Sequence, residues 1–289
     1  MITLKTIGIL AHPLREPSFP IAEQIYQTIQ QRGLASWFAT RWTVDEVNSQ
    51  VCESDLVIAI GGDGAMLRAA RVCAPHDVPV LGINMGQLGF LTEISDVQNW
   101  EPQLEAVLRG DRWIETRTMI RGTIQRGDQV IMGGDALNDI VISGSTVGRT
   151  IQLETYIDDH WTTTYYADAL VIATATGSTA YALACGGPIL PPELSNILIV
   201  PAAPHLSMSR PIVLAEGAKV DVMPSAANQQ PVLLIADGMV LDELRAGDKV
   251  CVRVSPYVSR FVRLRERNYF YRSLLDRLEP RVQRDGKYQ

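Results

Sequence analysis

The stretch that decides the fold class lies at residues 55–75, which read DLVIAIGGDGAMLRAARVCAP. Its first six residues are almost all apolar, which is typical of a strand in a parallel sheet that is covered on both faces. A glycine-rich turn, GGDG at 61–64, follows directly, and the pattern predicts a helix over 65–74 that ends before Pro75. Strand, turn and helix in this order form the unit from which α/β folds are built.

The same alternation extends on both sides of this stretch. Short apolar runs at 6–11 and 79–83 predict further buried strands. Apolar residues at helical spacing predict helices over 20–32 and 96–109, and a glycine follows each of them as a helix stop. We therefore predict an α/β domain with a parallel sheet over residues 1–111.

From residue 112 the pattern changes to short strand-like runs that are separated by Gly, Pro, Asp and Asn. Two runs, 120–125 and 130–132, flank RGDQ at 126–129 and predict a hairpin. Asp158 and Asp159 are predicted at another hairpin tip. The other runs are 150–157, 161–166, 197–200, 211–214, 219–223, 231–235, 249–254 and 261–264. We predict a β-rich domain over 112–268 and a helical tail over 269–289.

Length and composition exclude several classes of protein. A chain of 289 residues corresponds to about two domains, and 46% hydrophobic with 20% charged residues excludes disordered and collagen-like chains. The net charge of −6 argues against nucleic-acid and membrane-surface binding, because both partners are polyanions.

The sequence shows no apolar run of membrane-spanning length, no signal peptide and no CxxC pair, so we predict a cytoplasmic protein with reduced thiols. The histidines lack metal-ligand spacing.

The glycine-rich turn is the sharpest candidate for chemistry. Gly61, Gly62 and Gly64 let a phosphate approach the backbone, and the following helix offers free N–H groups and the positive end of its dipole. Asp63 would orient and deprotonate a hydroxyl nucleophile in phosphoryl transfer. Arg68 lies one helical turn further on, within reach of a phosphate. The alternative is a structural strand-to-helix turn in which Asp63 is only a cap.

A second candidate is ATATGSTAYALACGGP at residues 173–188. Small and hydroxyl-bearing residues stand between a predicted buried strand at 169–173 and a predicted helix at 179–184. Their backbone N–H and hydroxyl groups suit a phosphate or a ribose. A helix capped by Ser or Thr is the alternative explanation.

The third candidate is the pair Asn138 and Asp139 inside the apolar run ALNDIVI at 136–142. Two polar side chains in a strand are costly when they are buried without partners. An amide beside a carboxylate suits a base edge together with a ribose diol, whereas a bulge or turn at an exposed edge is the alternative. Arg149 follows and suits a pyrophosphate or a subunit contact.

Taken together and in order, these motifs resemble the NAD kinase family. The resemblance rests on GGDG at 61–64, NMGQLGFLTE at 84–93, ALND at 136–139, DALVIATATGSTAYALACGGP at 168–188, PAAPHLSMSRP at 201–211 and ADG at 236–238. GGDG alone is shared with lipid kinases and phosphofructokinases, whereas the TGSTAY block after an Asn-acidic pair is more specific. The resemblance implies phosphoryl transfer from ATP, or polyphosphate in some members, to the 2′-hydroxyl of the adenosine ribose of NAD. It also implies Mg²⁺ or another divalent metal ion and a homodimer or homotetramer.

The resemblance also implies a role for each matching position. Asp63 matches the proton acceptor, and Gly64 lies beside it in the NAD site. Asn138 and Asp139 match the pair that holds adenosine, and Asp168 matches a carboxylate that approaches the nicotinamide end across a subunit boundary. The other substrate-binding matches are Phe90, Arg149, Thr176, Thr179, Ala180, Tyr181, Ala182, Leu183, Ala184 and Ala203.

Some positions depart from the family pattern. Asp139 stands where Glu is usual, and Met239 stands where Gln usually follows the late Asp-Gly. Tyr166, Ala169 and Ala175 also differ, and these positions concern the nicotinamide end and the choice between NAD and NADH. Two other functions stay open from the residues: a diacylglycerol-type lipid kinase that shares GGDG, and a non-catalytic NAD(P)-binding sensor that would have lost the base.

Overall fold

The structure is a computed structural model that describes residues 4–12, 15–86, 89–146 and 148–278. It divides into two compact units. Unit 1 comprises Met1–Ala69, Val78–Glu115 and Phe261–Gln289, and unit 2 comprises Ala70–Asp77 and Thr116–Arg260. Within the described residues, none of the helices is long and apolar enough to cross a membrane.

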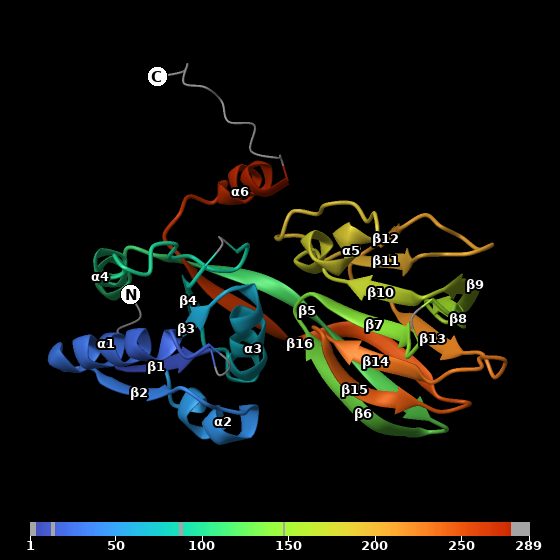
Figure 1. Ribbon diagram of the computed structural model, residues 1–289, viewed down its shortest axis with the longest axis horizontal. Helices are drawn as coiled ribbons and strands as arrows, with labels where there is room; N and C mark the ends of the chain where they lie inside the picture. Colours follow the sequence, from blue (N-terminus) through green and yellow to red (C-terminus); the bar gives the residue numbers. More distant parts are fainter. Residues whose placement is uncertain (1–3, 13–14, 87–88, 147, 279–289) are drawn as a thin grey trace, which may run out of the picture. The chain divides into compact units, whose positions relative to one another are not determined.

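Unit 1 is built on a parallel sheet (Figure 1). Its strand order is β2 (Ala35–Ala39), β1 (Thr6–Ala11), β3 (Leu56–Gly61) and β4 (Val80–Asn84), and the last residues of β16 (Lys249–Arg263) pair parallel to β4. The helices of this unit are α1 (Ser18–Gln31), α2 (Val44–Cys52), α4 (Glu101–Arg109), α6 (Tyr269–Leu278) and the first turns of α3 (Asp63–Cys73).

The strands of this sheet are buried because apolar side chains cover them. Ile7 and Ile9 of β1 and Ile58 of β3 form one cluster with Ile25 and Ile29 of α1. Full burial of such a side chain contributes about 1.5–3 kcal/mol. This burial explains why β1, β3 and β4 have near-continuous apolar sequences. The structure confirms these predicted strands and the α/β class of this part.

Unit 2 contains two antiparallel sheets. One has β12 (Ile212–Leu214), β11 (Ile197–Ala202), β10 (Ala169–Ala173), β7 (Asp139–Gly144), β14 (Val232–Ala236) and β15 (Met239–Leu244) in this order. The other contains β5 (Trp113–Arg126), β6 (Gln129–Ala136), β8 (Ile151–Ile157), β9 (His160–Ala167), β13 (Val220–Pro224) and β16.

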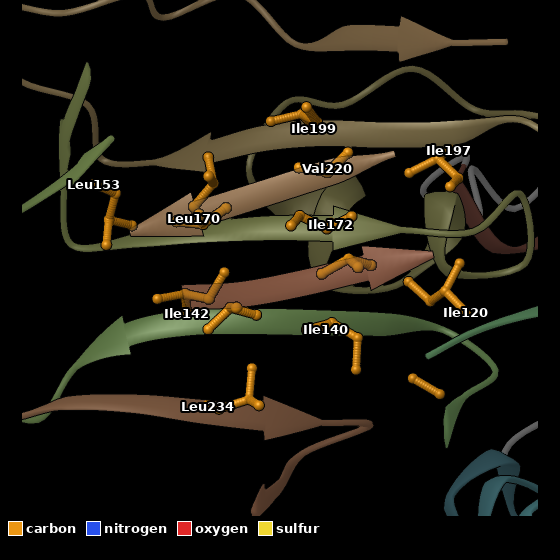
Figure 2. Close-up of a cluster of buried hydrophobic side chains, with 14 of the residues drawn as sticks. Ile120, Ile140, Ile142, Leu153, Leu170, Ile172, Ile197, Ile199, Val220 and Leu234 are labelled. Atoms are coloured by element: carbon orange, nitrogen blue, oxygen red, sulfur yellow. The ribbon is translucent and has the colours of Figure 1, made fainter. Parts of the chain in front are cut away.

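The main core of unit 2 lies between these two sheets (Figure 2). Strand alternation explains it: Leu170 and Ile172 of β10 point into this core, whereas Val171 joins a second cluster with Ala182. Leu153 and Val220 reach the main core from the opposite sheet. These runs confirm the prediction of a β-rich C-terminal part.

Several element boundaries differ from the predicted ones. The helix predicted over 96–109 begins only at Glu101, because Asp96 forms a turn in which its side chain accepts the N–H of Gln98 at 3.0 Å. The runs at 249–254 and 261–264 are one strand, β16. The helix predicted over 179–184 splits into a 3₁₀ turn, η2 (Gly177–Thr179), and the single turn α5 (Tyr181–Ala184).

The apolar run ALNDIVI is not one strand, since β6 ends at Ala136 and β7 begins at Asp139. The strands β2 and β15 and the helix α2 are not among the predicted elements. Asp158 and Asp159 do lie at a hairpin tip, both with positive φ. Of the predicted tail, residues 279–289 lie outside the described residues.

Candidate active site

In unit 1 the glycine-rich turn lies at the carboxyl edge of the parallel sheet. β3 ends at Gly61 and α3 begins at Asp63, so the turn leads directly into the helix. In open α/β sheets, ligands bind outside this edge. A Cβ placed on Gly62 or Gly64 would meet no described atom within 4 Å. Packing therefore does not require glycine at these two positions, and the N-terminus of α3 has room for a phosphate.

The carboxylate of Asp63 is held by a neighbouring backbone segment. Its Oδ2 accepts the N–H of Phe90 at 2.7 Å, and its Oδ1 accepts the N–H of Leu91 at 2.9 Å. A Cβ on Gly89 would overlap Oδ1 of Asp63, so any other residue at this position would have to displace the carboxylate. Residues 89–91 of the segment NMGQLGFLTE thus pack against the predicted base, and Asp63 does more than cap a helix.

Basic side chains lie near the same edge of the sheet. The guanidinium of Arg68 lies 5.3 Å from the ring centre of Trp42. Burial, together with the charges of Arg15 and Arg68, lowers the pKa of His12. Since these charges act on His12, which follows β1, the two arginines form a cationic environment that suits an anionic ligand, whereas the lowered pKa favours the neutral form of His12.

In unit 2, Asn138 and Asp139 lie at a corner between β6 and β7 that Asp237 shapes. Oδ2 of Asp237 accepts the N–H of Leu137 at 2.8 Å, and Oδ1 accepts those of Asn138 and Asp139 at 2.8 and 3.2 Å. Three backbone N–H groups thus bond to a side chain instead of a neighbouring strand. This is the physical reason why the predicted continuous strand is interrupted.

The TGSTAY block is locked onto the same corner. The hydroxyl of Thr174 donates to the carbonyl of Leu137 at 2.5 Å, and the N–H of Thr174 donates to the carbonyl of Asn138 at 2.9 Å. A Cβ on Gly177 would overlap the Asn138 carbonyl oxygen. The structure therefore brings together two motifs that are far apart in the sequence.

The electrostatics of this corner are unusual. Burial and the charge of Asp237 raise the pKa of Asp139 to about 7. Burial also raises the pKa of Asp237, while the N–H groups of residues 137–139 lower it. Burial, Cys185, Asp168 and Asp139 raise the pKa of Tyr181, so these groups share one electrostatic environment.

The remaining predicted residues of unit 2 take up different positions. Asp168 directly precedes β10, and its N–H donates to the carbonyl of Ala202 at 3.0 Å. Ala203, the next residue after Ala202, has a positive φ of 48°. Seven of the predicted substrate-binding residues lie in or next to η2 and α5: Thr176, Thr179, Ala180, Tyr181, Ala182, Leu183 and Ala184. Arg149 is exposed, its carbonyl accepts from Gln230 at 2.6 Å, and the described contacts do not join it to this group.

Two residues that the sequence patterns did not single out belong to this corner. Buried Arg117 donates from Nη1 to the hydroxyl of Thr176 at 3.0 Å. Asp237 lies in the ADG motif, where only a turn between two apolar runs marks it. Among the described residues, no group of three His, Cys, Asp or Glu side chains is arranged to hold a metal ion.

Comparisons with known proteins identify the family of the chain. The family model for the ATP-NAD kinase N-terminal domain matches residues 7–112, and that for the ATP-NAD kinase C-terminal domain matches residues 137–264. An NAD kinase of Chloroflexus aurantiacus is 40% identical over 278 residues, covering 95% of this chain and 99% of the other. One of Geotalea daltonii is 36% identical over 277 residues, covering 92% and 96%.

Solved structures show the same fold. Yeast NADH kinase complexed with NADH matches with a TM-score of 0.82 at 21% identity, over 99% of this chain and 89% of the other. An NAD kinase from Archaeoglobus fulgidus in complex with ATP matches with a TM-score of 0.73 at 21% identity, over 94% and 97%. The chain therefore belongs to the NAD kinase family, the enzymes that phosphorylate NAD to NADP with ATP.

Proposed function

We propose that this chain transfers the γ-phosphoryl group of ATP to the 2′-hydroxyl of the adenosine ribose of NAD, with Asp63 as the general base. Asp63 carries the proposal, because its carboxylate is fixed by two N–H groups next to glycines that leave room for phosphate. As the new O–P bond forms, the hydroxyl gives its proton to Asp63 and ADP leaves. A positioned base of this kind contributes about 10²–10⁴-fold to the rate.

The donor phosphates are proposed to bind at the N-terminus of α3. Gly61, Gly62 and Gly64 form the cradle, because the first N–H groups of a helix and its dipole favour anions. Arg68, with Arg15 in the same cationic environment, offsets the negative charge of the phosphates. The acidic net charge of the chain makes this local compensation necessary.

The adenosine of NAD is proposed to bind at the corner of unit 2. The Asn138 amide suits a base edge, and the Asp139 carboxylate accepts hydrogen bonds from ribose hydroxyls. Tyr181, with 45% of its surface exposed, offers a wall for the nucleotide. The other predicted contacts stay predictions; they are Phe90, Arg149, Asp168, Thr176, Thr179, Ala180, Ala182, Leu183, Ala184 and Ala203.

A divalent metal ion fits this chain as a partner of the ATP phosphates. Mg²⁺ is usually held by one or two carboxylates together with substrate phosphates. This agrees with the donor set of the chain, since the described residues form no metal cage and Asp63 is the carboxylate of the cradle. When bound, Mg²⁺ neutralises phosphate charge. Asp63 would face the metal ion, and Arg68 would face the phosphates.

We also propose that the native enzyme is a homodimer or homotetramer. β6 pairs with β5 alone, and its Val130, Ile131 and Met132 are exposed. An apolar edge strand invites pairing, which a second copy would satisfy. Light scattering that finds a fully active species of 31.9 kDa at assay concentration would exclude this.

The test of the reaction compares Asp63→Asn with a control variant in an assay with NAD, ATP and Mg²⁺, in which an NADP-specific dehydrogenase detects the product. Asp63→Asn is expected to lose about 10²–10⁴-fold in kcat. Asp45→Asn is the matched control, because Asp45 is an exposed acid in the first turn of α2. Near-normal turnover of folded Asp63→Asn removes Asp63 from the mechanism.

Asp139→Ala tests the acceptor side. Loss of a buried hydrogen-bond partner costs about 1–3 kcal/mol, so the KM for NAD should rise about tenfold or more, and the KM for ATP should stay almost unchanged. Asp139→Glu should be milder. Loss of ATP affinity with retained NAD affinity would place Asp139 on the donor side instead.

A further inference from the structure

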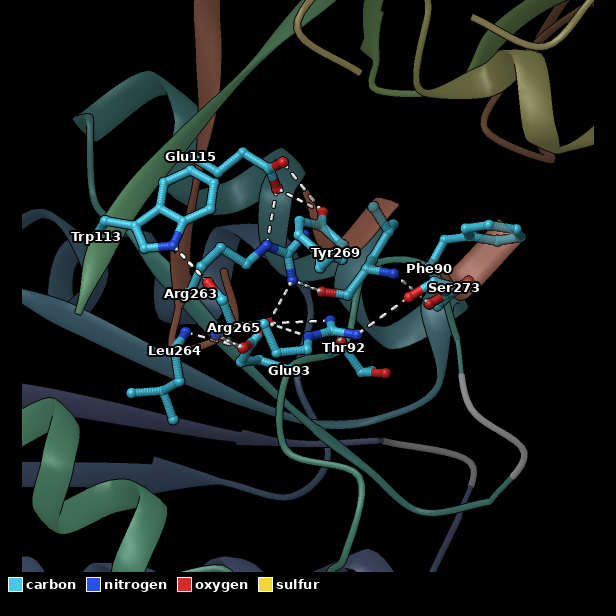
Figure 3. Close-up of polar contacts among 12 residues, drawn as sticks. Phe90, Thr92, Glu93, Trp113, Glu115, Arg263, Leu264, Arg265, Tyr269 and Ser273 are labelled. Carbon is cyan, nitrogen blue, oxygen red and sulfur yellow. Dashed lines mark hydrogen bonds and ion pairs between the residues drawn. The ribbon is translucent and has the colours of Figure 1, made fainter. Parts of the chain in front are cut away.

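A buried cluster of charged side chains in unit 1 lies outside the residues assigned above (Figure 3). Arg263, on β16, is completely buried, and its Nε donates to Oε2 of Glu115 at 2.8 Å. The hydroxyl of Tyr269, in the first turn of α6, donates to the same carboxylate at 3.0 Å. The guanidinium of Arg263 also lies 5.0 Å from the Tyr269 ring centre.

This cluster also binds residues 91–93, which directly follow the backbone in contact with Asp63. Nη1 of Arg263 donates to the carbonyl of Leu91 at 2.8 Å, and Nη2 of Arg265 donates to the carbonyl of Thr92 at 2.9 Å. Buried Glu93 accepts the N–H groups of Leu264 and Arg265, both at 2.8 Å. Residues 91–93 are thus bonded on one side to the end of β16.

The same segment is bonded to Asp63 on its other side. Leu91 is the shared residue: its N–H donates to Asp63 at 2.9 Å, while its carbonyl accepts from Arg263 at 2.8 Å. We propose that Arg263, supported by Glu115 and Tyr269, is a positioning residue that acts through Leu91 to set the place of the Asp63 carboxylate. This proposal rests on the role of Asp63 as the general base.

Burial makes this arrangement effective. A guanidinium presents its donors in a fixed fork, so Arg263 joins Glu115 and Leu91 at a set distance, which a flexible ammonium does not. Glu93 and Glu115 are also buried, so neither carboxylate finds a substitute partner in water. A misplacement of about 1 Å at a catalytic group can cost about 10²-fold in rate.

The test is a double-mutant cycle in the full-length enzyme. Arg263→Lys keeps the charge and removes the fork, and it should lower kcat by about tenfold or more, with KM values for ATP and NAD changed less than about twofold. In the Asp63→Asn background the same substitution should lower kcat by less than about twofold, because groups that act as a unit are not additive. Tyr269→Phe removes only a hydroxyl, keeps the ring, and should show the same pattern more weakly.

Arg126→Lys is the matched control. Arg126 forms a two-bond pair with buried Asp248 at 2.7 Å, and both residues belong to unit 2. An equal fall in kcat in both backgrounds, or a rise in KM with kcat kept, would overturn the positioning role. Full activity of Asp63→Asn alone would instead overturn the proposed base. If Arg263→Lys does not fold, Tyr269→Phe decides by the same comparison.

Discussion

Gly177 and Asn138 lie in direct backbone contact, so close that any Cβ on Gly177 would overlap the carbonyl oxygen of Asn138. The N–H of Thr174 donates to that same carbonyl at 2.9 Å. The start of the TGSTAY block and the pair Asn138 and Asp139 therefore form one rigid piece of backbone. A side chain introduced at Gly177 has to move both motifs.

Gly177→Ala should therefore lower both stability and NAD affinity. Overpacking of this kind costs about 1–3 kcal/mol, which should lower the Tm by several degrees and raise the KM for NAD. A thermal melt and initial rates measure the two effects. An unchanged Tm would show that the backbone yields easily at this contact.

Gly64→Ala should have the opposite profile. A Cβ there meets no described atom within 4 Å, so the Tm should stay unchanged. Because the proposed phosphate occupies that space, kcat/KM for ATP should fall about tenfold or more, which corresponds to about 1.4 kcal/mol. Retained kcat/KM would mean that the phosphates bind elsewhere.

Asp139 should make stability depend on pH. Its pKa in the folded protein is about 7, above the ordinary value of 3.8. The stabilisation from this group is complete below the lower value and is lost as the pH rises through the higher one, because the unfolded chain ionises first. Urea unfolding should show a larger loss of stability from about pH 5 to about pH 8 in the wild type than in Asp139→Asn. Equal losses in both proteins would contradict the raised pKa.

Asp237→Asn should shift the pH dependence of NAD binding. The Asp237 charge helps to raise the pKa of Asp139, so its removal should lower that pKa. An ionised carboxylate accepts stronger hydrogen bonds from ribose hydroxyls. The KM for NAD should therefore fall as the pH rises, with a midpoint at lower pH in Asp237→Asn than in the wild type. An unchanged midpoint would show that the charge of Asp237 does not influence the pKa of Asp139.

The sequence predicts the parts of the fold that local patterns determine. Continuous apolar runs reveal β1, β3 and β4 because these strands are buried. The edge strand β2 is short and partly exposed, so its pattern is weak. The sequence does contain a signal for the start of α2. Thr43 and Glu46 form a capping box, and their T-x-x-E spacing is typical of a helix N-terminus.

The supports of the site could not be predicted in this way. Asp237 bonds to N–H groups that lie 98–100 residues earlier in the chain. Arg263 bonds to residues 148–172 positions away. No periodicity records such pairings, because the three-dimensional path of the chain creates them. Local motifs therefore indicate the residues that are proposed to contact the substrate. The residues that support them, such as Asp237 and Arg263, can be identified only from the structure.

The return of the chain to unit 1 at Phe261 also determines when unit 1 can complete its folding during synthesis. A nascent chain that has reached only residue 115 already contains Glu93 and Glu115, but their arginine partners have not yet been made. Two buried carboxylates without partners oppose compact folding. Residues 1–115 should therefore stay incompletely folded on the ribosome until β16 and α6 have been synthesised. A fragment of residues 1–115 should not fold as the intact enzyme does.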